Sequence, residues 1–247
     1  MLVAASRKAA FEKDGYIVVE DLFPGEYMQE AKAEVRRVLD AVNAECAARG
    51  EKPRNKANGV YVGLSLNSGF FKRFNADPRL VDILEDLVGP NLEFWSDKIV
   101  FKSAGVDFGS PWHQDWQYWH GANKYSLWIA LDDATRENGC LKVLPGSHTR
   151  VFQHGGRDEE GIGFGNRMRK EDIDESKAVD LPARAGTAVF FHDLLLHASY
   201  PNTTGRDRWA LIPTYRDASK DDYDYGFAQA AFMVRGQRTG KSLGVKG

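Results

Sequence analysis

Apolar residues in the first ninety positions recur at helical spacing. Between residues 25 and 49 they return every three or four positions, which predicts a long helix with one buried face. Asp77 and Pro78 predict the start of another helix, since aspartate caps a helix and proline suits its first turn. A short strand is expected at 16–19, where four β-forming residues follow a glycine. We therefore predict a mainly helical part over residues 1–90.

From residue 91 the pattern changes to short runs of β-forming residues, separated by turns that contain Gly, Asn, Asp or Pro. Strands without helical patterns between them are typical of an antiparallel barrel or sandwich. The predicted strands are 92–95, 98–102, 125–131, 141–144, 188–191 and 209–215. We expect a β core over residues 91–235, within a single domain that spans residues 1–235.

Three segments fall outside both patterns. Residues 154–180 contain five glycines and little apolar periodicity, which is typical of a functional lid or a disordered insertion. Residues 51–65 begin with a polar run containing Pro and Gly, so they are a second candidate lid. The Gly-rich, basic tail 236–247 is expected to be disordered.

Composition limits the classes of function. The chain has 247 residues, 43% hydrophobic and 28% charged, with a net charge of −2, which disfavours disorder and non-specific nucleic-acid binding. Its two cysteines, Cys46 and Cys140, exclude a disulfide framework and a cysteine-rich zinc site. No apolar run approaches the length of a membrane span, and no signal-peptide core is evident at the start. We expect a cytoplasmic protein that acts on a small molecule, with its oligomeric state left open.

The candidate chemistry is concentrated in a His-x-Asp pair between two tryptophans. If residues 112–116 form a strand, His113 and Asp115 share one face, because side chains alternate along a strand. A second histidine would then complete the two-histidine, one-carboxylate set that binds non-haem Fe(II). Six histidines give roughly a one-in-three chance that a His-x-Asp pair arises by accident. The residues around the pair must therefore decide whether it binds a metal.

His192 and His197 compete for the role of the second histidine. His192 ends an apolar run at a predicted turn, where a bond to the backbone is expected. His197 is the better ligand because it would share one strand face with Leu195 and Ser199.

Arg208 adjoins the predicted strand 209–215. An arginine that points inward is costly to bury without a carboxylate, and its planar fork suits bidentate binding of one. A dicarboxylate cosubstrate would supply that partner, whereas an exposed turn position is the alternative. Trp112, Trp116 and Trp119 are either a pocket wall beside the metal or ordinary core.

Five segments in this order resemble the phytanoyl-CoA dioxygenase family of Fe(II)/2-oxoglutarate oxygenases. They are His113-Gln114-Asp115, 128–132, 138–148, His197-Ala198-Ser199 and Arg208. The resemblance implies a mainly β protein with flanking α-helices and a double-stranded β-helix core of the jelly-roll or cupin-like kind. It also implies that Fe(II), 2-oxoglutarate and O2 are used.

The resemblance further implies roles for individual residues. His113, Asp115 and His197 would be the catalytic metal ligands, and Asp115 separates this sequence from related halogenases, which have a small residue there. The cosubstrate would contact Arg208, Ser199, Trp128 and Lys98. Apart from the resemblance, the concentration of aromatic residues beside the pair makes Trp112, Trp116 and Trp119 candidate substrate contacts, and Tyr61 is a further candidate in the lid 51–65.

The expected reaction is hydroxylation of an unactivated C–H bond of a small molecule, with formation of succinate and CO2. The same cofactors can support desaturation, cyclisation or epimerisation in natural-product biosynthesis. A non-catalytic binding domain is the alternative from another class, but it would not need three metal-ligand residues and an inward arginine.

Overall fold

The computed structural model describes residues 2–52, 59–102, 108–156 and 165–246. Its larger sheet has the strand order β1-β7-β4-β9-β3-β11, with β2 paired to β3, and every pairing in it is antiparallel. The bounds are β1 Tyr16–Val19, β2 Val60–Val62, β3 Leu92–Lys102, β4 Lys124–Ala130, β7 Ala188–His192, β9 Arg208–Asp217 and β11 Phe232–Arg235.

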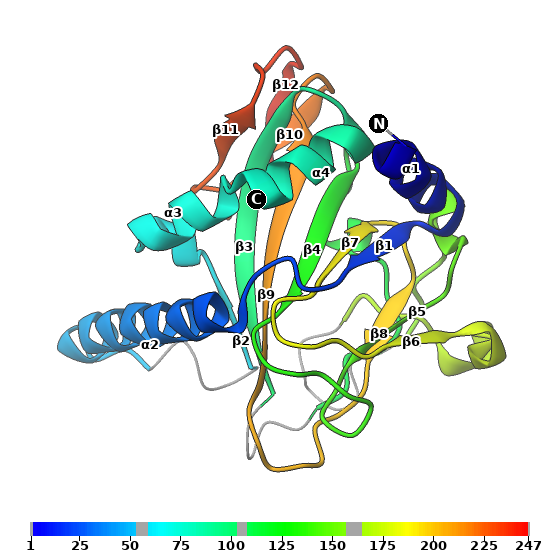
Figure 1. Cartoon of the computed structure of the whole chain (residues 1–247). Helices are drawn as coiled ribbons and strands as arrows, with labels where there is room; N and C mark the ends of the chain where they lie inside the picture. The colour runs from blue at the N-terminus through cyan, green and yellow to red at the C-terminus, as the bar shows by residue number, and fades with distance from the viewer. Residues whose placement is uncertain (1, 53–58, 103–107, 157–164, 247) are drawn as a thin grey trace.

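A smaller antiparallel sheet has the order β6-β5-β8 and lies beside the larger one (Figure 1). Its strands are β5 Leu141–Val143, β6 Val179–Leu181 and β8 His197–Ser199. Apolar side chains from both sheets share one core cluster, in which Leu141 and Leu181 join Trp128, Phe191 and others. Two facing antiparallel sheets with flanking helices confirm the predicted jelly-roll fold class.

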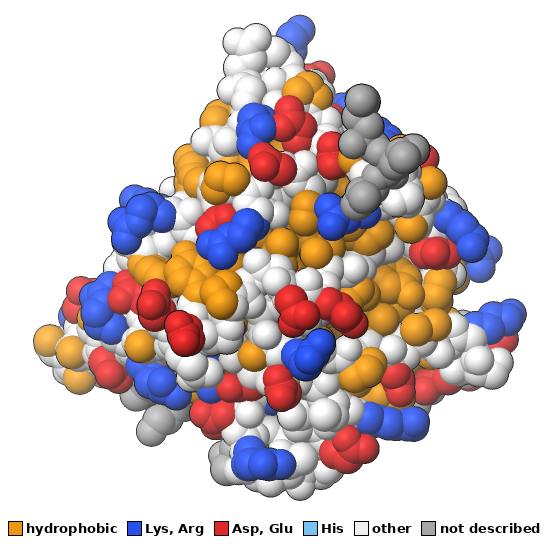
Figure 2. Space-filling view, in the orientation of Figure 1, with side chains coloured by type: hydrophobic (Ala, Val, Ile, Leu, Met, Phe, Trp, Pro, Cys, Tyr) orange, Lys and Arg blue, Asp and Glu red, His pale blue; other side chains and the backbone are white. Residues whose placement is uncertain are grey.

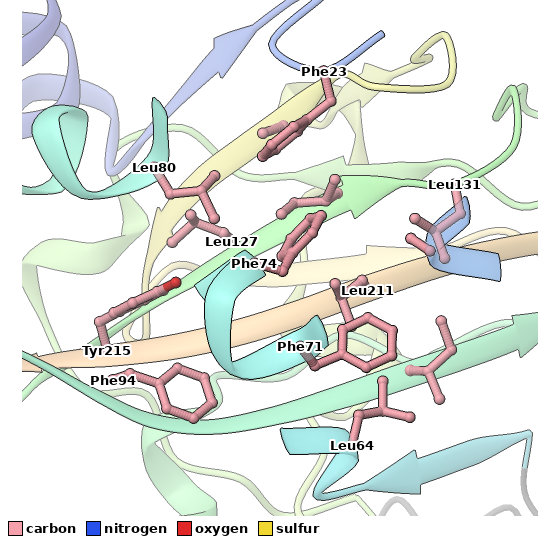
Figure 3. Packing of buried hydrophobic residues seen from close by; sticks show 14 of the residues in the cluster. Phe23, Leu64, Phe71, Phe74, Leu80, Phe94, Leu127, Leu131, Leu211 and Tyr215 are labelled. Atoms are coloured by element: carbon pink, nitrogen blue, oxygen red, sulfur yellow. The ribbon is translucent and has the colours of Figure 1, made fainter. Parts of the chain in front are cut away.

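The helices cover the opposite face of the larger sheet, and α4 crosses its strands in Figure 1. They are α1 Leu2–Asp14, α2 Gly25–Ala48, α3 Gly69–Asn75 and α4 Pro78–Val88. The short α5 Trp116–Trp119 does not belong to this layer. Figure 3 shows Phe71 and Phe74 of α3 packed with Leu127 and Leu211 of the sheet. Among the described residues, no helix is both long and apolar enough to cross a membrane.

Most predicted elements are present. The strand 16–19 and the helices at 25–49 and after Asp77 are confirmed, and Asp77 accepts a hydrogen bond from the backbone N–H of Arg79. The runs 92–95 and 98–102 are not separate strands, because they form one strand, β3, with an irregularity between Phe94 and Ser96. Helix α3 was not predicted, since seven residues are too few to show a helical period.

The tail differs from the predicted disorder. Residues Ser242–Lys246 form β12, which pairs in parallel with β10 Asp222–Tyr225. Basic side chains of the tail meet acidic or carbonyl partners: Arg238 contacts Glu93, and Lys246 Nζ donates to the carbonyl oxygen of Trp119. The prediction of disorder from composition did not consider these partners, because they lie far from the tail in the sequence.

The surface in Figure 2 shows acidic and basic side chains interspersed between hydrophobic patches. No field of one sign dominates this face, in agreement with the net charge of −2.

Alternation along the strands separates the two faces of the larger sheet. On β9, Trp209, Leu211 and Tyr215 pack among the helices, whereas Arg208 and Ile212 face the smaller sheet. The space between the sheets therefore receives polar side chains that a fully packed core would exclude.

Candidate active site

His113, Asp115 and His197 lie together between the two sheets, and all three are buried. One potential ligand atom from each residue lies within 4.8 Å of the others. His113 Nε2 is 3.4 Å from Asp115 Oδ1, and His197 Nε2 is 3.8 Å from the same oxygen. Two imidazoles and one carboxylate thus face a common point, which is the donor set expected for non-haem Fe(II).

The backbone brings these residues together in a different way from the one predicted. His113 and His197 form an isolated antiparallel bridge, with N–H to O distances of 3.1 Å in both directions. The predicted strand over 112–116 is wrong beyond this bridge, because Asp115 has helical dihedral angles and leads into α5. This turn, rather than strand alternation, brings the carboxylate to the two imidazoles.

Both histidines are oriented by backbone carbonyls. His113 Nδ1 lies 2.8 Å from the oxygen of Pro111, and His197 Nδ1 lies 2.9 Å from the oxygen of Leu195. A carbonyl oxygen can only accept, so each Nδ1 carries the proton and each Nε2 presents its lone pair. This is the tautomer in which a histidine binds a metal through Nε2.

The protonation states also suit a divalent cation. Burial lowers the pKa of His197 to about 3, so its imidazole is neutral at pH 7. Burial alone would raise the pKa of Asp115, but the nearby Lys98 ammonium holds it below its usual range. The cluster therefore offers a neutral imidazole at His197 and a carboxylate at Asp115.

Gln114, the residue between two members of the cluster, is fully buried and points away from them. Its amide nitrogen donates to the carbonyl oxygens of Arg150 and Leu194 at 2.9 and 2.6 Å. Its amide oxygen accepts from the N–H of Phe152 at 2.9 Å, and its backbone N–H donates to His154 Nε2. Gln114 thus anchors the turn that carries the cluster.

Replacing Gln114 with alanine should lower the free energy of unfolding by about 2–4 kcal/mol, because three buried hydrogen bonds are lost and their partners are left unpaired. Urea denaturation measures this loss. Gln117→Ala is the matched control, because the half-buried Gln117 makes a single 3.2 Å bond to the oxygen of Phe152 through its amide nitrogen. An equal loss in both variants would contradict the anchoring role.

Arg208 begins β9 and is 1% exposed. Its Nε and Nη1 have no hydrogen-bond partner among the described residues, and its guanidinium lies 5.5 Å from the ring centre of Trp128. Burial lowers the pKa of Arg208 to about 10, so the group keeps its charge at pH 7. A buried, charged and unpaired fork is costly, and a carboxylate ligand satisfies it.

The cluster and Arg208 line the same cavity, which has a volume of about 500 Å³. Trp128, Ser199 and Lys98 also line it, and Lys98 Nζ is 3.8 Å from Asp115 Oδ2. The wall further contains the aromatic residues Trp95, Phe108, Tyr118, Trp119 and Phe227. The cavity therefore combines a metal-ligand cluster, a buried cation and a largely apolar wall.

Of the four residues predicted to contact substrate, Trp119 alone lines this cavity. The predictions for Trp112, Trp116 and Tyr61 are not supported by their positions. Trp112 packs against Met168 and donates to Glu175, and it lines a neighbouring hollow. Trp116 lies in another hollow beside His120.

Tyr61 lies on strand β2 but faces the helical core, where its hydroxyl accepts a bond from Asn67. Its neighbours Val60 and Val62 line the cavity instead. Because successive side chains of a strand point to opposite sides, a shift of one position decides which residue reaches the site. Because side chains alternate along a strand, the neighbours of Tyr61, Val60 and Val62, could have been considered as lining residues from the sequence. No local sequence pattern identified Trp95, Phe108 or Phe227.

The two predicted lids are only partly described. Residues 157–164 and 53–58 lie outside the described residues, so these parts of the predictions stay predictions. The described parts of 154–180 contribute to the hollow beside Trp112 and not to the cavity. His192 is not in the cluster, and its Nδ1 accepts from the N–H of Leu194, as predicted for a turn residue.

A jelly-roll core with a buried His-Asp-His cluster and an inward arginine defines the class of Fe(II)/2-oxoglutarate-dependent oxygenases. Residues 11–210 match the model of the family described as phytanoyl-CoA dioxygenase (PhyH), and the chain belongs to this family. It is an oxidoreductase that uses Fe(II), 2-oxoglutarate and O2.

Two relatives illustrate the range of this family. An ectoine dioxygenase of Stutzerimonas stutzeri (strain A1501) is 28% identical over 232 residues, which cover 86% of this chain and 76% of the relative. An L-proline trans-4-hydroxylase of Streptomyces griseoviridis is 33% identical over 165 residues, which cover 56% of this chain and 59% of the relative.

Solved structures agree with the fold. The non-heme monooxygenase ThoJ, in its apo form, has a TM-score of 0.75 and 26% identity, covering 97% of this chain and 87% of the other. EctD from S. alaskensis, solved with 2-oxoglutarate and 5-hydroxyectoine, has a TM-score of 0.71 and 24% identity, covering 88% and 77%. At this level of identity EctD supports the fold alone.

Proposed function

We propose that His113, Asp115 and His197 bind Fe(II), and that the enzyme hydroxylates an unactivated C–H bond of a small molecule. The observation that carries this proposal is the buried Arg208, which has two unpaired nitrogens and lines the same cavity as the metal-ligand cluster. When bound, Fe(II) and 2-oxoglutarate supply the oxidation: O2 is consumed, and succinate, CO2 and an alcohol are formed.

Arg208 is proposed to bind the distal carboxylate of 2-oxoglutarate, with Ser199, Trp128 and Lys98 as further contacts. Arg208 lies on the larger sheet and His197 on the smaller one, and both line the cavity, so both carboxyl ends of the acid would have a fixed partner. The guanidinium of Arg208 lies over the ring of Trp128 at 5.5 Å, while the ammonium of Lys98 helps to keep Asp115 ionised.

The substrate is proposed to be a small organic molecule that contacts Trp119 and the other aromatic residues of the wall. Trp95 and Trp119 meet edge to face at 5.1 Å, and Phe227 packs against Trp95 at 4.9 Å. Such a wall excludes water from the metal side and suits an apolar or flat group. The two relatives act on ectoine and L-proline by name, which supports a small molecule without selecting one.

A screen of small-molecule substrates tests this proposal. Purified enzyme with Fe(II) and 2-oxoglutarate in air should release succinate faster with the true substrate, and the product should gain one oxygen atom. A product that has lost two hydrogens would mean desaturation or cyclisation, and an unchanged mass would mean epimerisation. Absence of stimulated succinate release with every compound, together with absence of acid binding, would contradict the proposal.

We also propose that residues 1–235 form a single domain, because the N-terminal helices and the larger sheet share one core cluster. A cytoplasmic location is proposed on the basis of the two buried free thiols, Cys46 and Cys140.

A further inference from the structure

Lys102 is a buried lysine to which no role at the proposed site has been assigned so far. It ends β3 directly opposite Arg208, its register partner on β9, and its side chain is fully buried. Two like charges at opposed strand positions repel each other, and burial increases the cost. Burial and the charge of Arg208 lower the pKa of Lys102 to about 6. Without a ligand, Lys102 is therefore mainly a neutral amine at pH 7, and its ammonium form needs a negative charge nearby.

The Lys102 amino group is held at two points. Its Nζ donates to Ser199 Oγ at 2.8 Å and also to the carbonyl oxygen of Tyr200. Space for the side chain comes from Gly139, whose φ is +102°. A Cβ there would lie 2.7 Å from Lys102 Cδ and 2.7 Å from the oxygen of Tyr200. The glycine of the Asn-Gly-Cys segment thus permits this close approach.

The bonds of Ser199 determine where its proton points. Its Oγ accepts from Lys102 Nζ and, at 3.2 Å, from the backbone N–H of Ser110. A hydroxyl oxygen has two lone pairs, so both are used and the O–H remains free to donate. A carboxylate bound at Arg208 favours the ammonium form of Lys102. An ammonium has no lone pair and cannot take this proton. Ser199 lines the cavity together with Arg208, where a ligand carboxylate would accept the bond.

We propose that Lys102 is a positioning residue that fixes the Ser199 hydroxyl as a hydrogen-bond donor to the distal carboxylate of the acid bound at Arg208. This rests on the proposed binding of 2-oxoglutarate. The negative charge of the acid also offsets the repulsion between the two cations.

The test compares two 2-keto acids on the Fe(II)-loaded protein without oxygen, by calorimetry. 2-Oxoglutarate has the distal carboxylate and pyruvate lacks it. Lys102→Met should weaken 2-oxoglutarate binding about tenfold, the loss expected for one oriented hydrogen bond, and leave pyruvate binding unchanged. Ser199→Ala should have the same effect, and the double variant should be no weaker than Ser199→Ala by more than about twofold.

Lys124→Met is the matched control. Lys124 is equally buried on the same face of the sheet, but it pairs with Asp222 at 2.8 Å, and its replacement should leave both affinities unchanged. Lys102→Gln, which keeps an N–H donor, should recover 2-oxoglutarate binding to within about threefold of the wild type and serves if Lys102→Met fails to fold.

Equal weakening of both acids in Lys102→Met, or multiplicative losses in the double variant, would overturn the positioning role. No recovery in Lys102→Gln would also overturn it. Wild-type protein that binds neither acid would overturn the proposed function itself, and this inference with it.

Discussion

Replacing His197 with alanine should weaken Fe(II) binding by more than about a hundredfold, since even changes to the groups that support a metal ligand cost 10- to 100-fold. The variant would leave one imidazole and one carboxylate, which are too few to hold the ion firmly. His197 is oriented for this role, because its Nδ1 is bound to the oxygen of Leu195 and its Nε2 faces the cluster. Succinate formation should fall to background.

Anaerobic Fe(II) titration measures this loss, with His192→Ala as the control. His192 is the other histidine of this region and lies at the end of β7, where it bonds to the backbone. Its removal should leave the Fe(II) affinity within about threefold of the wild type. Equal losses in the two variants would mean that His197 is not a specific ligand.

Replacing Arg208 with methionine should have opposite effects on ligand binding and on stability. Loss of the fork should weaken 2-oxoglutarate binding by about 30- to 1000-fold, the range for removing one partner of a buried charge pair. Without ligand, the variant should be more stable than the wild type by about 1–3 kcal/mol, because an unpaired buried charge is replaced by an apolar chain of similar size.

Arg216→Met separates this effect from the general loss of a buried arginine. Arg216 lies on the same strand and is almost as buried, but it pairs with Glu93 at 2.6 Å and Asp222 at 2.9 Å. Its replacement should lower the free energy of unfolding by about 2–4 kcal/mol, with 2-oxoglutarate affinity preserved. Calorimetric binding and urea denaturation give both quantities. Loss of stability in Arg208→Met as large as that in Arg216→Met would contradict the account.

The fold class and the cluster could be predicted because their signals are local. Apolar periodicity marks the long helices, and the residue types of His113, Asp115 and His197 indicate their chemistry whatever the backbone does. The prediction of a continuous strand at 112–116 was wrong in detail, yet the residues converge through a turn.

The cavity wall could not be predicted in the same way, because it depends on strand register and on contacts between distant segments. Tyr61 and Val62 are adjacent, but one faces the helices and the other the cavity. Phe227 reaches the wall only because the segment after β10 packs against Trp95. No local pattern marks Lys102 as buried, because its burial follows from the pairing of β3 with β9.

The most direct test of the central account is anaerobic titration of Fe(II) and then 2-oxoglutarate into the protein, followed by admission of air and measurement of succinate. The account predicts one Fe(II) and one 2-oxoglutarate bound per chain, and succinate that depends on both. It also predicts loss of Fe(II) binding in His113→Ala and loss of acid binding in Arg208→Met. Protein that binds neither, or Asp115→Ala that keeps full activity, would contradict it.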